Sequence, residues 1–318
     1  MKLLVVIVNY RTADLTIACL RSLVDEIARV PGARVVITDN ASGDDSVERI
    51  SRAIDDNKWS WATLMPLASN GGFAWGNNQA IEPALRSDDP PEFIYLLNPD
   101  TLMRPGGITR LLEFLEQNPK VGIAGGASVN GAGEPLSTGF RFHTVLGELE
   151  GGLRLGVASK LLAKHMVATG AHTEPQEVDW VVGASMMIRR AVFEAIGTFD
   201  PKYFMYFEEV DFCMRARRAG FATWVAPQSE IVHLVGASSG VTSANRVEKR
   251  RPRYWFDSRH RFFIRNYGIV STILADVAFA CGYAIHTVLN KLRGRPRTDP
   301  PWLLWDFVRY NMTSWSHR

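Results

Sequence analysis

Short apolar runs alternate with helical patterns along the first 125 residues of the chain. The runs at 3–8, 34–38 and 93–97 (LLVVIV, RVVIT and FIYLL) are almost continuously apolar, as expected of strands that are buried on both faces of a parallel sheet. The segments that follow them place apolar residues at helical spacing. This alternation predicts an α/β fold with a doubly wound, mainly parallel sheet and right-handed crossovers.

Composition places the chain among soluble globular proteins. The 318 residues are 46% hydrophobic and 22% charged, which argues against disordered, collagen-like and polytopic membrane proteins. The three cysteines form no CxxC or Cys/His pattern, so zinc ribbons and disulfide frameworks lack support and a reducing cytosolic compartment is favoured. The first apolar run is too short for a signal peptide, so we expect the protein to work on the cytoplasmic side.

Polar residues follow three of the predicted strands, where ligands of open α/β sheets bind. Asn9 and Tyr10 follow the first strand. Asp39 closes the second strand, and its carboxylate can accept hydrogen bonds from a nucleotide base or ribose. Asn98-Pro99-Asp100 ends the most hydrophobic internal strand, and Asp100 can supply one oxygen ligand to Mg²⁺ or Mn²⁺ against phosphates. For both carboxylates the alternative is a helix-capping or turn-stabilising role.

The run Glu208-Glu209-Val210-Asp211 places three carboxylates within four residues, between apolar segments. Buried like charges raise the pKa of one carboxylate, which suits a general base. His233 gains a functional role only if Asp100 and the acidic run converge on it, since a lone histidine is more often structural. The glycines around Gly72 resemble a phosphate cradle without matching an established nucleotide-binding motif.

The second half of the chain is less regular. Residues 127–175 contain many glycines and predict long loops with a hairpin or short helix, a segment that could form an acceptor-side flap. A strand is expected at 178–183, helices at 189–196 and over much of 204–220, and a strand at 221–226. This organisation divides the chain into a domain at 1–235 and an extension at 236–318.

The extension is basic, whereas the rest of the chain is acidic. From residue 246 onward there are 14 Lys and Arg against 5 Asp and Glu. Residues 269–289 are apolar and about long enough to cross a bilayer, but Asp276 and His286 make spanning costly. We therefore expect a helix that lies at an anionic membrane surface. The alternative is a soluble amphipathic helix packed on the main domain. No RNA- or DNA-binding module is present, so nucleic acid is not an expected partner.

Seven motifs in order resemble the inverting glycosyltransferase family 2, which has the Rossmann-like GT-A fold. They are VVIVNYRT, VITDNASGDDS, NGGFAWGNNQAI, LLNPDT, VDWVVGASMMIRR, GTFDPKYFMYFEEVDFCMRARRAGF and HLVGASSG. Together they span Val5 to about His233. The later RYWFDSRHRFFIRNYG further resembles the rhamnosyltransferase-like branch, which builds surface polysaccharides on lipid carriers.

The resemblance implies a role for each matching residue. Asp100 would be the principal contact of a divalent metal (Mg²⁺ or Mn²⁺), completed by His233, and Asn98 stands where the family usually has the first Asp of its metal motif. Glu209 would be the catalytic base in place of the family's Asp, with Asp211 left open as the alternative. The donor-binding residues would be Asn9, Tyr10, Arg11, Asp39, Asn70, Gly72, Asn98, Asp100 and Gly183.

The resemblance thus implies metal-dependent transfer of a sugar, L-rhamnose from dTDP-L-rhamnose, to a lipid-linked or polysaccharide acceptor. Residues 1–125 would bind the donor and 126–235 the acceptor, at the cytoplasmic face of the inner membrane. A UDP-hexose donor and a non-catalytic nucleotide- or carbohydrate-binding protein stay open as alternatives. A nucleotidyltransferase would need a glycine-rich basic loop after the first strand, and residues 9–12 are not one. The oligomeric state is not predicted.

Overall fold

The chain forms two compact units, here called the sheet unit and the helical unit. The computed structural model describes residues 1–234, 249–296 and 299–313. The sheet unit comprises Met1–Phe140, Gly170–Phe204 and Glu208–Ser238, and the helical unit comprises Arg141–Thr169, Met205–Phe207 and Ser239–Arg318. Residues 141–169, expected in the acceptor-side half, therefore group with the C-terminal helices. The HLVGASSG motif from residue 235 onward lies outside the described residues.

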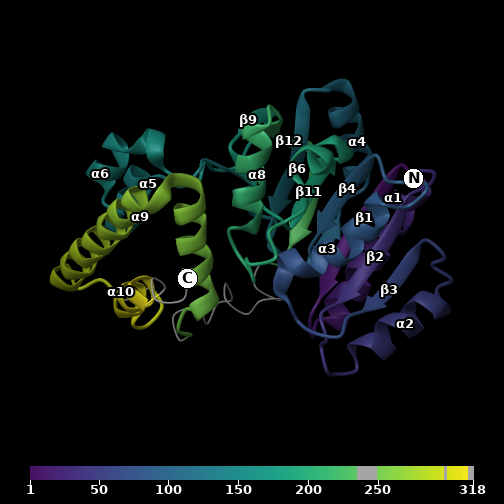
Figure 1. Cartoon of the computed structure of the whole chain (residues 1–318), viewed down its shortest axis with the longest axis horizontal. Coiled ribbons are helices and arrows are strands. Elements are labelled where there is room, and N and C mark those ends of the chain that lie inside the picture. The colour runs from purple at the N-terminus through teal and green to yellow at the C-terminus, as the bar shows by residue number, and fades with distance from the viewer. Residues whose placement is uncertain (235–248, 297–298, 314–318) are drawn as a thin grey trace. The chain divides into compact units, whose positions relative to one another are not determined.

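The first half of the sheet unit is a parallel α/β arrangement (Figure 1). Its strands are β1 (Leu3–Asn9), β2 (Arg34–Asp39), β3 (Ala62–Pro66) and β4 (Phe93–Leu97), and its helices are α1 (Ala13–Ala28), α2 (Ser46–Asp56), α3 (Gly72–Leu85) and α4 (Gly107–Gln117). β1 pairs in parallel with β2 and with β4, and β2 pairs in parallel with β3. Every residue of β1 and β4 is buried, which explains their continuous apolar runs.

The second half adds both parallel and antiparallel strands, so that the large sheet runs β3-β2-β1-β4-β11-β6-β12-β5. β6 (Val121–Val129) and β12 (Ala222–His233) are parallel, whereas β11 (Ser185–Arg189) is antiparallel to both β4 and β6. The remaining elements are β5 (Thr101–Met103), β7 (Pro135–Leu136), β8 (Gly139–Phe140), α7 (Arg190–Ile196) and α8 (Glu208–Arg218). The sheet is thus mainly parallel and doubly wound, as predicted.

The expectation of one strand at 178–183 is wrong. The segment holds the end of β9 (Gln176–Val178), which pairs with β12, and β10 (Trp180–Val181), which pairs with β8 in a separate two-stranded sheet. Between them the Asp179 amide donates to the Phe140 carbonyl oxygen at 2.9 Å, which draws the chain toward the smaller sheet. β12 is also longer than expected and ends at His233, so that this histidine lies within a strand.

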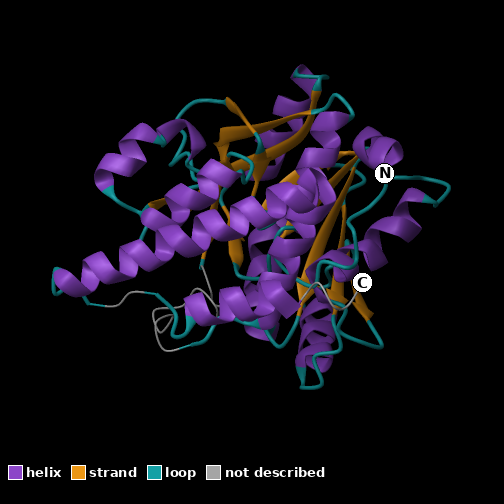
Figure 2. Cartoon of the chain, turned by 60° about the vertical axis from the view of Figure 1, so that its left-hand side comes forward, coloured by secondary structure: helices purple, strands orange, loops and turns teal. Residues whose placement is uncertain are grey.

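All the strands that the structure describes belong to the sheet unit, and the helical unit consists of helices and loops (Figure 2). Its elements are α5 (Val145–Leu153), α6 (Gly156–Leu161), the 3₁₀ turn η1 (Ala163–His165), α9 (Arg253–Leu292) and α10 (Leu303–Thr313). Gly268 interrupts α9 with φ 77° and ψ 177°, a conformation that only glycine adopts readily. The predicted helix at 269–289 is therefore the second part of α9.

Candidate functional site

A buried polar cluster lies at the carboxyl ends of β1 and β2. Asn9 and Asp39 are register partners, and Asn9 Nδ2 donates to Asp39 Oδ2 at 2.6 Å. The Ser42 amide donates to Asp39 Oδ1 at 3.0 Å, and Ser42 Oγ donates to Asp39 Oδ2 at 2.6 Å. Both oxygens of Asp39 thus accept hydrogen bonds from within the protein. Asp39 therefore stabilises the turn after β2, as its alternative role predicted, at the sheet edge where a ligand is expected.

The residues after β1 are held against this turn. The Arg11 amide donates to Ser42 Oγ at 2.9 Å, and Arg11 Nε donates to the Ser42 carbonyl oxygen at 2.8 Å. Arg11 adopts a φ of 57°, which is uncommon for a residue with a side chain. Its guanidinium carbon lies 5.2 Å from the centroid of the Tyr10 ring, which is 40% exposed. An exposed aromatic ring and a cation thus stand beside the buried cluster.

The Asn98-Pro99-Asp100 segment is a turn between β4 and β5. The Asn98 carbonyl oxygen accepts from the Thr101 amide at 3.3 Å and from Thr101 Oγ1 at 2.6 Å. Backbone pairing of β5 with β12 brings His233 to the same place, and His233 Nε2 lies 3.4 Å from Asp100 Oδ1. The side chain of Asp100 is 1% exposed and that of His233 is 17% exposed. The structure therefore brings together the two residues expected to share a metal.

The glycine-containing loop before α3 makes a close backbone contact. Asn70 Oδ1 accepts from the Gly72 amide at 3.0 Å, and the Phe73 amide donates to the Phe204 carbonyl oxygen at 2.7 Å. Gly72 has a φ of 87°, and a Cβ there would lie 1.9 Å from the Phe204 oxygen. Only glycine allows this approach. Gly183 is likewise adjacent to this loop, because a Cβ on it would lie 3.1 Å from the Phe73 ring.

The first turn of α8 buries two carboxylates. Glu208 is 4% exposed and Glu209 is half-buried, and the Oε2 atom of each is enclosed without a hydrogen-bond partner among the described residues. Burial raises the pKa of Glu209 to about 7. Burial, followed by repulsion from Glu209, raises the pKa of Glu208 well above its usual range. A carboxylate with a pKa near neutrality and an available oxygen suits proton abstraction.

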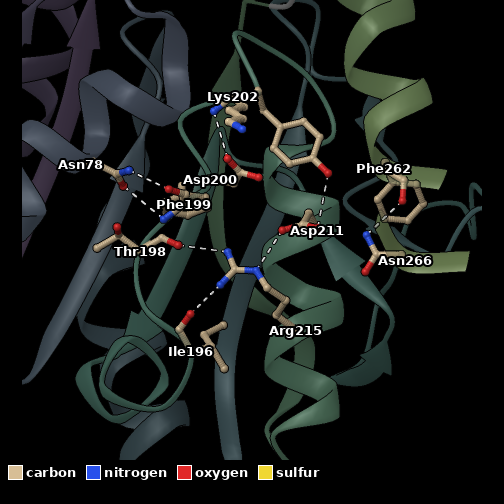
Figure 3. A network of polar contacts seen from close by, with 11 residues as sticks. Asn78, Ile196, Thr198, Phe199, Asp200, Lys202, Asp211, Arg215, Phe262 and Asn266 are labelled. Carbon is tan, nitrogen blue, oxygen red and sulfur yellow. Dashed lines mark hydrogen bonds and ion pairs between the residues drawn. The ribbon is translucent and has the colours of Figure 1, made fainter. Parts of the chain in front are cut away.

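Asp211, two residues after Glu209 in α8, has a different environment (Figure 3). It is completely buried and accepts from Arg215 Nε at 2.9 Å and from the Tyr203 hydroxyl at 3.3 Å. Arg215 in turn donates to the carbonyl oxygens of Ile196 at 2.7 Å and Thr198 at 3.0 Å. The carboxylate of Asp211 therefore anchors α8 to the preceding loop, whereas Glu209 has no such ion pair within residues 1–234, 249–296 and 299–313.

Three residues that connect the site were not singled out from the sequence. Asn40, which is 2% exposed, donates through Nδ2 to the Gly72 carbonyl oxygen at 3.0 Å and so links the β2 turn to the glycine loop. Ser42 joins Asp39 to Arg11, and Arg215 neutralises Asp211. The spacing of Arg215 four residues after Asp211 is a signal that the sequence does carry. The contacts of Asn40 and Ser42 depend on loop geometry.

The Asp100–His233 pair could bind a divalent ion only if a substrate supplied the remaining ligands. Among residues 1–234, 249–296 and 299–313 no group of three or more His, Cys, Asp or Glu side chains is placed to hold a metal ion. Magnesium is commonly held by one or two carboxylates together with substrate phosphates rather than by a complete protein cage. One carboxylate and one imidazole at a sheet edge therefore fit an ion whose other ligands come from a diphosphate.

Comparison with known sequences places this site in context. The model of a family described as "Glycosyltransferase like family 2" matches residues 2–259. The chain is 26% identical over 224 residues to N-acetylglucosaminyl-diphospho-decaprenol L-rhamnosyltransferase of Mycobacterium tuberculosis, covering 67% of this chain and 70% of the relative. It is 27% identical over 268 residues to the low-salt glycan biosynthesis hexosyltransferase Agl10 of Haloferax volcanii, covering 82% of this chain and 75% of that protein.

Comparison with solved structures identifies the fold. A mannosyltransferase from Pyrobaculum calidifontis, solved with GDP-mannose and Mn²⁺, aligns with a TM-score of 0.54 and 14% identity. The alignment covers all of this chain and 88% of the mannosyltransferase. At this identity the comparison establishes a shared GT-A fold, in agreement with the prediction from sequence.

Proposed function

Because the chain belongs to glycosyltransferase family 2 and is a glycosyltransferase, we propose that it transfers L-rhamnose from dTDP-L-rhamnose to a lipid-linked acceptor, with inversion at the anomeric carbon. The single observation that carries the mechanism is the half-buried carboxylate of Glu209 at the start of α8, whose Oε2 atom has no hydrogen-bond partner in the described part of the chain. The rhamnosyl donor and lipid-linked acceptor are supported by the name of the mycobacterial relative.

The proposed donor site is the edge of the sheet at the ends of β1, β2 and β4. The exposed Tyr10 ring and the Arg11 guanidinium suit a base and a phosphate, and the turn closed by Asp39 positions both. Asn70, Gly72 and Gly183 would keep the backbone close enough for the donor to lie against it. In this proposal Asn98 shapes the turn that carries Asp100, since its backbone makes the hydrogen bonds that close that turn.

Asp100 and His233 would hold a divalent ion on the donor's diphosphate, as their 3.4 Å separation allows. Bound there, the ion would offset the negative charge of the leaving group. Glu209 would remove the proton of the acceptor hydroxyl while the hydroxyl oxygen attacks the anomeric carbon. One base without a covalent nucleophile gives a single displacement, and therefore inversion. Asp211, in its ion pair with Arg215, would keep α8 in place.

The proposed location of the enzyme is the cytoplasmic face of the inner membrane, where a lipid-linked acceptor is available to a cytoplasmic enzyme. The division into a donor-binding half at about 1–125 and an acceptor-side half within 126–235 belongs to the same proposal. The second candidate donor is a UDP-hexose, for which the hexosyltransferase relative supports the hexose.

Binding and transfer should be measured with dTDP-, UDP- and GDP-sugars, with and without Mn²⁺ or Mg²⁺. We expect metal-dependent binding of dTDP-rhamnose that Asp100→Ala weakens at least about tenfold, equivalent to about 1.4 kcal/mol. Asp88→Ala, which removes an exposed carboxylate, is the matched control. Preference for a UDP-hexose would keep the transferase and replace the donor. Absence of binding to every sugar nucleotide would contradict the proposal.

A further inference from the structure

The second part of α9 exposes a continuous apolar surface, here called the outer stripe. Its members are Val270, Leu274, Val277, Cys281, Ile285, Val288 and Leu292. They follow one another at intervals of three or four residues, so on a helix with 3.6 residues per turn they lie within an arc of about 80°. Cys281 is exposed, and the other six side chains are between 48% and 78% exposed.

The opposite face of the same helix makes the packing contacts of the helical unit. Gly282 lies against α5, where a Cβ on it would come within 2.9 Å of the Leu149 carbonyl oxygen. Phe279 packs on Phe307 of α10 with ring centroids 4.5 Å apart. A helix of a soluble protein normally turns its apolar face inward and its polar face to water. The second part of α9 departs from this arrangement, because apolar side chains are exposed along the outer stripe while the charged Asp276 is paired within the helical unit.

That charge, Asp276, belongs to a buried and paired cluster. Arg259, which is 1% exposed, donates from Nη1 to Asp276 Oδ1 at 2.5 Å. It also donates from Nε and Nη2 to Glu148 Oε2 at 3.0 and 2.8 Å, and His143 Nδ1 lies 2.9 Å from Glu148 Oε1. His286 Nδ1 is 3.0 Å from the Leu153 carbonyl oxygen. Asp276 and His286 thus have partners within the helical unit, and neither belongs to the outer stripe.

These contacts favour a helix that lies along a bilayer surface over one that crosses it. By length and composition alone α9 could span a membrane, with a mean hydropathy of 1.7 over its most apolar window. A spanning helix would need lipid or protein around its whole circumference at bilayer depth, and the side facing α5 carries an ionised cluster. A stripe on one side, with packing on the other, matches the geometry of an interfacial helix.

Other exposed residues of the helical unit match an anionic bilayer. Lys291, Arg293 and Arg295 follow at the end of α9, and all three are exposed. Trp302 and Trp305, at and near the start of α10, are 65% and 61% exposed. Basic side chains bind anionic headgroups, and indole rings prefer the boundary between headgroups and hydrocarbon. The charge and the aromatic residues thus favour a lipid surface as the occupant over a neutral protein surface.

We propose that the outer stripe is a docking surface for an anionic phospholipid bilayer, with α9 lying in the plane of the interface. This deepens the proposed function, because it rests on the proposed location at the membrane and names the surface responsible. The paired cluster of Arg259, Asp276 and Glu148 holds α9 in the orientation that exposes the outer stripe.

The test is flotation of the full chain with vesicles, without any sugar nucleotide, so that its result is independent of catalysis. We expect binding to phosphatidylglycerol/phosphatidylcholine vesicles and a loss of about tenfold or more for Leu274→Asp and for Val277→Asp. Val24→Asp is the matched control, because it places the same charge on an exposed apolar residue of α1. Equal losses in the control and in the stripe variants, or no vesicle binding by the native chain, would overturn the proposal.

A second experiment tests the contribution of charge with a variant in which Lys291, Arg293 and Arg295 are all replaced by Gln. Binding to the phosphatidylglycerol vesicles should fall about tenfold and lose most of its salt dependence, since each cation near an anionic surface contributes. The control replaces Arg34, Arg52 and Lys120, three exposed cations of the sheet unit, by Gln. A fall of equal size in that control would show attraction by net charge alone and contradict a defined docking surface.

Cys281 provides a depth measurement in the native sequence. Cys19 and Cys213 are buried, so an environment-sensitive fluorophore should label Cys281 in the folded chain. On vesicle binding its emission should shift to the blue and be quenched more by a nitroxide near the headgroup than by one at the acyl-chain end. Stronger quenching by the deep nitroxide would contradict an interfacial helix. Self-association without lipid that Leu274→Asp abolishes, with no vesicle binding, would identify a second copy of the chain as the occupant instead.

Discussion

Two glutamates with enclosed carboxyl oxygens, one in each unit, have pKa values that are shifted in opposite directions. Glu148 in the helical unit is 6% exposed and is bonded to Arg259 and His143; despite its burial, the charge of Arg259 lowers its pKa to about 2. Glu209 in the sheet unit has an enclosed oxygen without a partner among the described residues, and burial raises its pKa to about 7. The partner, rather than the depth of burial, decides which form of the carboxyl is favoured.

The difference separates a structural role from a chemical one. A buried carboxylate that is fully paired contributes to the fold and is not available to exchange a proton with a substrate. Burial without a counter-ion destabilises the ionised form of a carboxyl group, but it leaves an oxygen available to an acceptor hydroxyl. Asp211 lies only two residues after Glu209 and is paired with Arg215, so the distinction holds within one helix.

The largest expected effect comes from removing the partner of Glu148. Arg259→Met removes the buried arginine that Glu148 and Asp276 share and should lower the free energy of unfolding of the helical unit by about 3–5 kcal/mol. Chemical denaturation followed by circular dichroism measures this. Arg253→Met removes an exposed arginine 3.3 Å from Asp257 and should cost less than about 1 kcal/mol. Equal costs for the two variants would show that the buried cluster is not structural.

The same contrast can be tested within α8 by two isosteric substitutions. Asp211→Asn removes the charge opposite Arg215 and should lower the free energy of unfolding by about 2–3 kcal/mol. Glu209→Gln replaces a carboxylate that has no ion pair among the described residues and should leave the free energy of unfolding unchanged or slightly increased. Thermal and chemical unfolding of both variants at neutral pH measure the difference. Comparable destabilisation by Glu209→Gln would mean that Glu209 has a structural partner after all.

The smallest effect is a difference in pH dependence. The pKa of Glu209 is raised, so its contribution to stability is fully present below its ordinary pKa of 4.5 and is lost as pH rises through about 7. Glu148 has the opposite sign, because its lowered pKa gives a contribution that is present above 4.5 and lost as pH falls toward about 2.

The stability of the native chain relative to Glu209→Gln should therefore fall by about 1–2 kcal/mol between pH 5 and pH 8. Unfolding at these two pH values, with each variant measured in the same buffers, gives the comparison. A difference that rises over this interval would reverse the assigned sign and contradict the unpaired state of Glu209.

Much of the sheet could be predicted because its strands are continuously apolar. β1, β2 and β4 are completely or largely buried parallel strands, and their sequences show it directly. β11 is a central strand too, but its five residues Ser185–Arg189 contain two methionines and run directly into α7. No sequence period distinguishes so short an antiparallel insertion from the neighbouring helix.

The site and the C-terminal helix show where prediction from sequence ends. The order of the motifs located Asp39, Asp100, Glu209 and His233, but not which carboxylates are paired. Asp276 argued against a membrane-spanning helix in the sequence, but its partner, Arg259, could not be identified there because it lies 17 residues earlier and beyond the break at Gly268. Whether a charge is costly depends on such contacts, which the three-dimensional structure determines.

The central claim, that the carboxylate of Glu209 is the catalytic base, is tested most directly by single-turnover transfer with Glu209→Gln. Transfer should slow by about 10³-fold, within the range that a general base contributes, while the dissociation constant of the donor is unchanged. Transfer at the native rate would contradict the claim. So would a loss of donor binding of the same size as the loss of transfer, because Glu209 would then hold the donor rather than activate the acceptor.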